Sequence, residues 1–304
     1  MRKDDESGCN RFGERDAHLR GGTNAVTALK SLSLTLRPGD FLSVLGPSGC
    51  GKSSLINTVA GFQKAQTGEV RVDGEPVSRP GPDRGVVFQQ PTLFPWKLVR
   101  ENVDFGLKFR KVPRPQRSQM IDDILQKVGL SEFGRHYPAQ LSGGMQQRVG
   151  LARVLVNKPR VMLMDEPFSS LDAQTRLMMQ ELLLQVWTEY GMTVLFVTHD
   201  IDEAIFLGSR LAVLTRRPGR LKALFDITLP RPRTIDTLVS KDFVTLKRTC
   251  VDLLREEMVG IPASTDIRRR HPRGGHDQVL VESADLAAWE TAHQPASAYE
   301  QNPR

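Results

Sequence analysis

The amino-acid sequence predicts an α/β fold with a largely parallel sheet. Short apolar runs of strand type alternate with longer amphipathic stretches of helical type along most of the chain. The connections between them are short, as in strand–helix–strand units. Polar or glycine-rich segments follow several of the apolar runs. Because ligands in such folds bind outside the carboxyl ends of the strands, functional residues are expected in these segments.

The first part of the chain predicts strands on either side of one short helix. Apolar and polar residues partly alternate over 25–36, and the run 41–45 has the composition of a buried strand. A helix is predicted over 54–60, ended by Gly61 as C-cap. Further strands are predicted at 69–72 and 85–88, and Asp73 followed by Gly74 indicates a hairpin turn.

The region 91–155 is predicted to be an inserted helical subdomain. Apolar residues recur at helical spacing over 101–109 and 119–130, and a further helix is expected over 145–156. Strand–helix alternation then resumes, with strands predicted at 161–164, 193–197 and 211–214 and helices at 173–190 and 201–207. The insertion interrupts that alternation and carries its own apolar faces.

Composition limits the class of protein without selecting a function. The chain has 304 residues, a net charge of +7 and three widely separated cysteines (Cys9, Cys50, Cys250), which form neither a disulfide framework nor a metal-binding spacing. The positive charge suits nucleic acid, an anionic membrane surface, a phosphorylated ligand or a solvated Arg-rich surface. No apolar run reaches the roughly 18 residues that a membrane span requires, so a membrane role is expected to come through a partner.

The predicted domain occupies 23–260. Residues 1–22 are polar and Gly-rich and are expected to form a flexible arm. Residues 261–304 begin with a basic, breaker-rich run and continue as a polar segment, which predicts a disordered tail.

The stretch 46–53 fits the phosphate-binding pattern G-x-x-x-x-G-K-[ST] and stands between a strand and a helix. Backbone N–H groups of such a loop and of the following helix start point to one place, where they can hold polyphosphate. Lys52 supplies positive charge to the outer phosphates, and Ser53 supplies a hydroxyl for Mg²⁺. The predicted nucleotide-binding residues are Gly46, Pro47, Ser48, Gly49, Cys50, Gly51, Lys52, Ser53 and Ser54.

Four polar residues stand at the ends of other strands. Asp165 follows an apolar run and can hold Mg²⁺ beside Ser53, although it could equally cap a helix. Glu166, next to that metal ligand, is the candidate that orients or deprotonates the attacking water. Gln89 could reach the metal or the water. His199 could hydrogen-bond a γ-phosphate, or be a structural histidine.

Residues 141–148 place a serine and two glycines before another predicted helix. This second helix N-terminus, with Ser142, Gly143 and Gly144, can also bind an anion. One mononucleotide does not need two phosphate-binding loops from one chain. A second chain, facing the first head to tail, would explain both.

Taken in order, these motifs and the segment Ser170, Leu171 and Asp172 resemble those of ABC-type ATPase subunits over about 25–260. The resemblance implies a RecA-like P-loop NTPase core with an antiparallel β subdomain and a helical subdomain. It implies a homodimer that encloses two ATP with Mg²⁺, in which Ser142, Gly143 and Gly144 close on the nucleotide of the other subunit. Asp172 would couple the two sites, and Gln89, Ser53 and Asp165 would contact the metal.

Finer features resemble the nitrate/sulfonate/taurine importer subfamily. They are the segments 83–89, 93–96, 141–148, 196–203 and 229–233. The resemblance implies an integral membrane permease, a periplasmic or extracellular solute-binding protein, and a place on the cytoplasmic face of the cell membrane. Leu93, Phe94 and Trp96 suit an apolar docking groove for the permease, or else belong to the subdomain core.

The sequence departs from the family pattern in two places. Residues 16–28 lack the aromatic residue that stacks on adenine in most members, so Phe12 or His18 would have to substitute. Met145 stands where many members have Gln. Two alternatives stay open: a soluble ABC ATPase acting on nucleic acid or ribosomes, and a nucleotide-binding module without turnover. No specific nucleic acid is expected, because the chain has neither a second cassette nor a long coiled-coil insertion.

Overall fold

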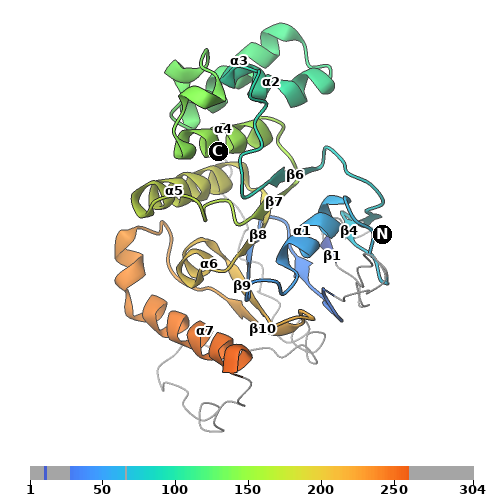
Figure 1. Ribbon diagram of the computed structural model, residues 1–304, viewed down its shortest axis with the longest axis vertical. Coiled ribbons are helices and arrows are strands. Elements are labelled where there is room, and N and C mark those ends of the chain that lie inside the picture. Colours follow the sequence, from blue (N-terminus) through green and yellow to red (C-terminus); the bar gives the residue numbers. More distant parts are fainter. Residues whose placement is uncertain (1–9, 12–27, 66, 260–304) are drawn as a thin grey trace, which may run out of the picture.

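The computed structural model describes residues 10–11, 28–65 and 67–259 (Figure 1). A six-stranded sheet forms its centre, in the order β10 (Leu221–Asp226), β9 (Arg210–Leu214), β3 (Phe41–Leu45), β8 (Thr193–Thr198), β7 (Val161–Asp165) and β6 (Arg84–Val87). All neighbours pair in parallel except β10, which is antiparallel to β9. The predicted α/β class with a largely parallel sheet is confirmed.

Strand β3 shows why this sheet lies in the interior. All five of its residues are buried. Phe41 and Leu45 face one apolar cluster, with Phe168 and Phe196. Leu42 and Val44 point to the opposite face, where they pack with Ile56 of α1 (Lys52–Ala60). Successive side chains of a strand alternate between faces, so a continuous apolar run can form only where both faces are covered.

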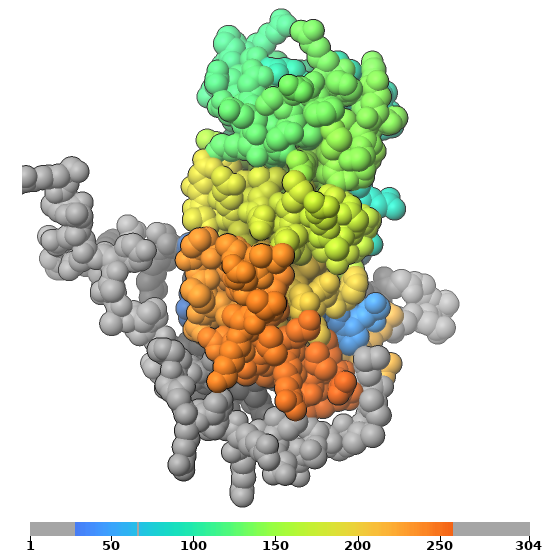
Figure 2. All heavy atoms as spheres, turned by 90° about the vertical axis from the view of Figure 1, so that its left-hand side faces the viewer, coloured from blue at the N-terminus to red at the C-terminus, as the bar shows by residue number. Residues whose placement is uncertain are grey.

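Helices cover both faces of the sheet. On the face opposite α1 lie α5 (Ala173–Tyr190), α6 (Ile201–Leu207) and α7 (Lys241–Val259), with a 3₁₀ turn at Ile235–Val239 before α7. Helix α6 packs on β3 and β8, and α7 packs on α6. Thus α7 forms an outer layer, visible in orange on the side of the molecule (Figure 2).

The helical subdomain forms a separate lobe at one end of the sheet (Figures 1 and 2). It consists of α2 (Val99–Phe109), α3 (Arg114–Lys127), two 3₁₀ turns (Ser131–Phe133 and Pro138–Gln140) and α4 (Gly143–Leu155). Its helices bury Val103, Leu107, Ile121, Leu125 and Val149 against one another. Helix α4 also contacts β6 and α5, so the lobe is packed against the core.

Some elements differ from the sequence-based prediction. Among the described residues 28–36, only β2 (Thr35–Leu36) is a strand, although Leu32 and Leu34 are buried. Its partner is β1 (Asn10–Arg11), inside the stretch predicted to be a flexible arm. The rest of 1–22 and the tail 261–304 lie outside the described residues. The hairpin of β4 (Arg71–Val72) and β5 (Glu75–Pro76) turns at Asp73 and Gly74 as predicted.

Strand β10 and helix α7 were missing from the prediction. Lys222 interrupts the apolar pattern of β10, and it is half-buried because its ammonium pairs with Glu256 and Glu257 at the end of α7. A charged residue within a strand is therefore balanced by acids from a distant helix, which local pattern does not reveal.

Candidate nucleotide site

The phosphate-binding loop connects β3 to α1 at the carboxyl edge of the sheet. Gly49 and Gly51 have φ of 77° and 110°, in the left-handed region that favours glycine. A Cβ on Gly51 would lie 2.7 Å from Cδ2 of Leu29 and 2.9 Å from the carbonyl oxygen of Ala28. Both the backbone conformation and the close approach of residues 28–29 therefore require glycine here.

Lys52 is only 5% exposed and lies under this loop. Its Nζ donates to the carbonyl oxygens of Gly46 (2.8 Å) and Pro47 (3.1 Å). It also lies 3.4 Å from Oε1 of Glu166. The ammonium is thus held at the loop with charge close to where outer phosphates would bind, and it joins the loop to the predicted catalytic acid.

Ser53 and Asp165 meet as the sequence predicts. Ser53 Oγ donates to Asp165 Oδ1 at 3.2 Å. Burial raises the pKa of Asp165, the Ser53 hydrogen bond opposes this, and the neighbouring Glu166 charge adds to it. A hydroxyl and a carboxylate oxygen are ligands that Mg²⁺ prefers, and the cation would favour the ionised carboxylate that burial disfavours. The donor pair therefore fits Mg²⁺.

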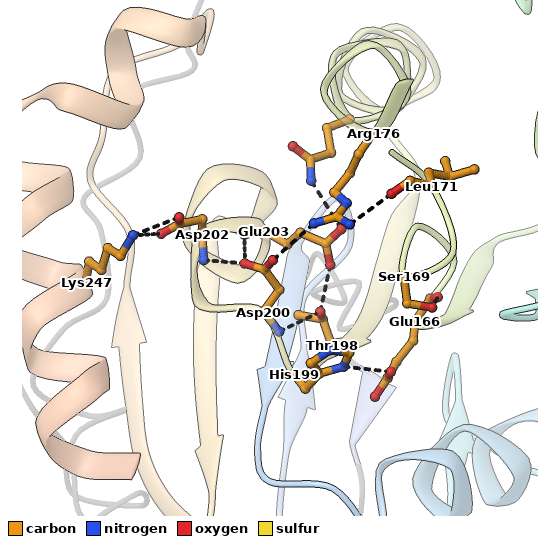
Figure 3. A network of polar contacts seen from close by, with 11 residues as sticks. Glu166, Ser169, Leu171, Arg176, Thr198, His199, Asp200, Asp202, Glu203 and Lys247 are labelled. Carbon is orange, nitrogen blue, oxygen red and sulfur yellow. Dashed lines mark hydrogen bonds and ion pairs between the residues drawn. The ribbon is translucent and has the colours of Figure 1, made fainter. Parts of the chain in front are cut away.

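Glu166 adopts a φ of 46°, which is uncommon for a residue with a side chain. Its N–H donates to the carbonyl of Val197 (3.0 Å), and its carbonyl accepts from the Ser169 hydroxyl (3.0 Å). Oε2 lies 2.8 Å from Nδ1 of His199 (Figure 3). Backbone strain of this kind persists where the surroundings enforce it, which is common at functional sites.

A pocket of about 260 Å³ opens above the loop. Its lining is Ala28, Ser48, Gly49, Gly51, Lys52, Ser53, Ser54, Glu166 and Arg217. Most of these residues were predicted, but Arg217 was not. It lies in the β9–β10 connection, which is fixed above the loop because Gly219 N–H donates to Ala28 O (2.8 Å) and Lys30 N–H donates to Gly219 O (2.9 Å). No local motif marks Arg217.

Other predicted site residues do not line this pocket. Gln89 is exposed beyond the end of β6. Ser142 caps α4 by accepting from the Met145 N–H (3.3 Å), and Gly143 beside it is exposed. Asp172 caps α5 through Thr175 N–H (2.9 Å). The start of α4 packs against the first turn of α5, which Asp172 caps, because a Cβ on Gly144 would lie 2.5 Å from Thr175 Cγ2.

Comparison with known proteins gives a consistent result. The protein family described as "ABC transporter" matches residues 29–169. An uncharacterized ABC transporter ATP-binding protein of Methanocaldococcus jannaschii is 46% identical over 78% of this chain and 87% of its own length. A taurine import ATP-binding protein of Chromobacterium violaceum is 51% identical over 65% of this chain and 76% of its own length.

A bicarbonate transport ATP-binding protein of Synechococcus elongatus is 41% identical over 80% of this chain but only 37% of its own length. Among solved structures, a dimeric ATP-binding cassette in a post-hydrolysis state with ADP and Pi has a TM-score of 0.63 and 32% identity, covering 72% of this chain and 98% of the other. These matches agree with the phosphate-binding loop and with the acids beside it. The chain belongs to the ATP-binding, ATP-hydrolysing protein family of ABC transporters.

Proposed function

We propose that this chain is the ATP-hydrolysing subunit of an importer, which energises uptake of a small solute through a separate membrane permease. One observation carries the catalytic part of the proposal. Lys52 of the phosphate-binding loop meets Glu166, and Glu166 meets His199, beside the Ser53–Asp165 pair. The charges that bind phosphate, hold a cation and activate water therefore lie at one edge of the sheet.

In this proposal the loop residues and Lys52 bind the β- and γ-phosphates of ATP. Ser53 and Asp165 would hold Mg²⁺, with Gln89 as a proposed third oxygen ligand. A bound Mg²⁺ would supply positive charge to offset the charge that develops on the phosphate oxygens. Arg217 adds a second positive charge at the pocket, on the side of Ala28.

Glu166 is the general base. It orients a water molecule and accepts its proton as the water oxygen bonds to the γ-phosphorus, while the bond between that phosphorus and the bridging oxygen of ADP breaks. His199 holds the Glu166 carboxylate through Nδ1, which leaves Nε2 free to face the γ-phosphate. The 53% exposure of the His199 side chain allows such a contact from the open side.

The segment 142–144 would complete the site of a second copy of the chain. It lies at the exposed start of α4, and it does not line the pocket of its own chain. The N-terminal N–H groups of a 13-residue helix are suited to an anion. The dimeric cassette structures support the assembly of two copies. In the proposed arrangement Asp172 would lie beside the same contact.

The helical subdomain offers a docking groove for the permease. A cavity of about 550 Å³ is lined by residues that include Phe94, Phe105, Phe109 and Arg153. Trp96 is 71% exposed and Phe109 is 85% exposed. This exposure argues against Trp96 belonging to the subdomain core, whereas Leu93 does pack against the core. Exposed aromatic side chains around a groove suit a partner helix. None of the described helices is both long and apolar enough to cross a membrane.

The relatives support the transport class. Taurine and bicarbonate are named for two of them, and the proposed solute here is of the nitrate, sulfonate or taurine kind. The chain would work at the cytoplasmic face of the cell membrane, with a solute-binding protein on the other side of the permease. A role on nucleic acid is the alternative. It predicts micromolar DNA binding that weakens steeply with salt, and we expect no such binding.

Glu166→Gln tests the catalytic assignment. The amide cannot accept the proton of water but preserves shape, so we expect MgATP binding to persist while hydrolysis falls about 100-fold or more. ATP should then hold the variant as a dimer, measured by size-exclusion chromatography with light scattering. Gln63→Glu, on the surface after α1, serves as a control that should keep parental turnover. Parental hydrolysis by Glu166→Gln contradicts the assignment of the base.

A further inference from the structure

Arg176, a residue that no motif singled out, joins two loops that carry functional residues. It lies in the first turn of α5. Its Nη2 donates to the carbonyl of Leu171 (2.9 Å), directly before Asp172. Its Nη1 lies 3.5 Å from Oδ2 of Asp200, directly after His199. Figure 3 shows the guanidinium between these two partners.

Asp200 holds the far end of this link. Its Oδ1 caps α6 by accepting from the N–H groups of Asp202 (2.8 Å) and Glu203 (3.1 Å). Its own N–H donates to Thr198 Oγ1 (3.0 Å). Asp200 is hydrogen-bonded to Thr198, the residue before His199, and to the start of α6, which follows Asp200. A displacement of its carboxylate therefore also displaces the backbone of His199.

The inner side of the same loop is fixed. Thr198 Oγ1 donates to Oε2 of Glu203 (2.7 Å), and Gln180 Nε2 donates to Oε1 (3.2 Å). Glu203 is only 4% exposed, and burial raises its pKa. The buried contacts hold Thr198 in place, so the half-buried Arg176–Asp200 pair is the adjustable side of the loop.

The other end of the link lies at the surface proposed to face a second subunit. Thr175, beside Arg176, donates its N–H to the Asp172 carboxylate, and its methyl group leaves no space for a side chain on Gly144. The first turn of α5 therefore contacts the start of α4 and the segment 171–172. Arg176, in the same turn, reaches Asp200. The contacts form a continuous path from that surface to His199 and Glu166 of the same chain.

We propose that Arg176 is a positioning residue. When a second subunit binds at 142–144 and 171–172, Arg176 transmits this contact to His199 and sets the position of His199 relative to Glu166. The inference rests on the proposed function, in which two copies share two composite sites. The guanidinium is planar and its two donors move together. A shift of the Leu171 carbonyl thus moves the donor that faces Asp200, and a small displacement near the reacting atoms changes rate strongly.

Arg176→Gln and Arg176→Lys test this role through ATP hydrolysis measured against ATP concentration. We expect Arg176→Gln to lower kcat about tenfold and to bring the Hill coefficient close to 1, with the Kd for MgATP within about twofold of the parent. Lys keeps the charge but not the two-armed geometry, so it should restore kcat only in part. Asp200→Asn, which retains a good helix cap, should lower kcat in the same direction.

Arg117→Gln is the matched control. Arg117 pairs with Asp104 and donates to Val112 O within the helical subdomain, away from the path, so its loss should leave kcat and cooperativity at parental values. Parental kcat and Hill coefficient in Arg176→Gln would overturn the proposal. So would equal losses of kcat, MgATP affinity and thermal stability, since they indicate a purely structural role.

A separate measurement distinguishes this inference from the proposed function. If the parent chain hydrolyses no ATP, the proposed function fails, and the link is then judged from the ring resonances of His199 in the nucleotide-free protein. A shift of those resonances in Arg176→Gln but not in Arg117→Gln supports the link. Unchanged resonances overturn it.

Discussion

Gly144→Ala is a sharp test of how tightly the start of α4 packs on α5. The added Cβ would lie 2.5 Å from Thr175 Cγ2, whereas the next nearest atoms, Thr175 Cβ and Oγ1, are at 3.8 and 3.9 Å. A single methyl group thus causes the whole conflict. Thr175 is β-branched and therefore stiff at χ1, and its N–H is bonded to Asp172, so it cannot turn aside freely.

The expected cost follows from this geometry. Carbon atoms pack best at roughly 3.5–4.0 Å, so α4 and α5 must separate by about 1 Å, and such overpacking costs about 1–3 kcal/mol. Gly143 is the matched control, since a Cβ there meets nothing within 4 Å. Gly143→Ala should be neutral or slightly stabilising, by up to about 1 kcal/mol, because Ala favours helix over Gly.

Thermal unfolding in the absence of nucleotide measures the difference. At about 2–4 °C per kcal/mol for a domain of this size, Gly144→Ala should melt several degrees below Gly143→Ala. Thr175→Ser removes the conflicting methyl group, so the double variant Gly144→Ala/Thr175→Ser should regain most of the loss. Equal melting of Gly143→Ala and Gly144→Ala would refute the reasoning, as would a double variant no more stable than Gly144→Ala.

Three further predictions concern the nucleotide pocket. Burial raises the pKa of Asp165, so its ionised carboxylate disfavours folding at pH values above that pKa. Without Mg²⁺, Asp165→Asn should therefore raise the melting temperature at neutral pH, by an amount that shrinks as the pH falls. The same substitution should abolish Mg²⁺-dependent ATP binding. The Cys50 thiol is 1% exposed, and burial raises its pKa. A thiol reagent at pH 7 should therefore modify it at least about tenfold more slowly than an exposed cysteine. Equal rates in a mass-spectrometric time course would contradict its burial. Arg217→Ala should weaken MgATP binding about five- to thirtyfold by loss of one charge-assisted contact, read by fluorescent-nucleotide displacement, whereas Arg160→Ala on the opposite edge should not.

The sequence predicted the fold class because two signals in it are local. Runs rich in apolar residues, such as 41–45 and 193–197, place apolar side chains on both faces and require cover on both, which a layered α/β arrangement gives. The hairpin at Asp73 and Gly74 and the helix stop at Gly61 follow from glycine's conformational freedom, and both occur as predicted. Elements stabilised by distant partners, such as β10 with Lys222 paired to α7, could not be found this way.

The candidate site likewise contains some features that local sequence predicted and others that depend on contacts between distant residues. The loop 46–53, Asp165, Glu166 and His199 were found by sequence because each ends or directly follows a strand, and parallel strands bring their carboxyl ends to one edge. The sequence could not give the contact between Lys52 and Glu166, nor the bond from Glu166 to His199, because these depend on the order of the strands in the sheet.

The sequence by itself thus determined which chemical groups are present, because phosphate binding requires a local loop of fixed spacing. The tertiary structure alone decided which groups act together. It brought Arg217 above the loop through hydrogen bonds between residues 28–30 and 219, and it set Arg176 between Leu171 and Asp200. The physical reason is that a guanidinium on a long side chain finds its partners through space, so neither residue's neighbours in sequence reveal what it binds.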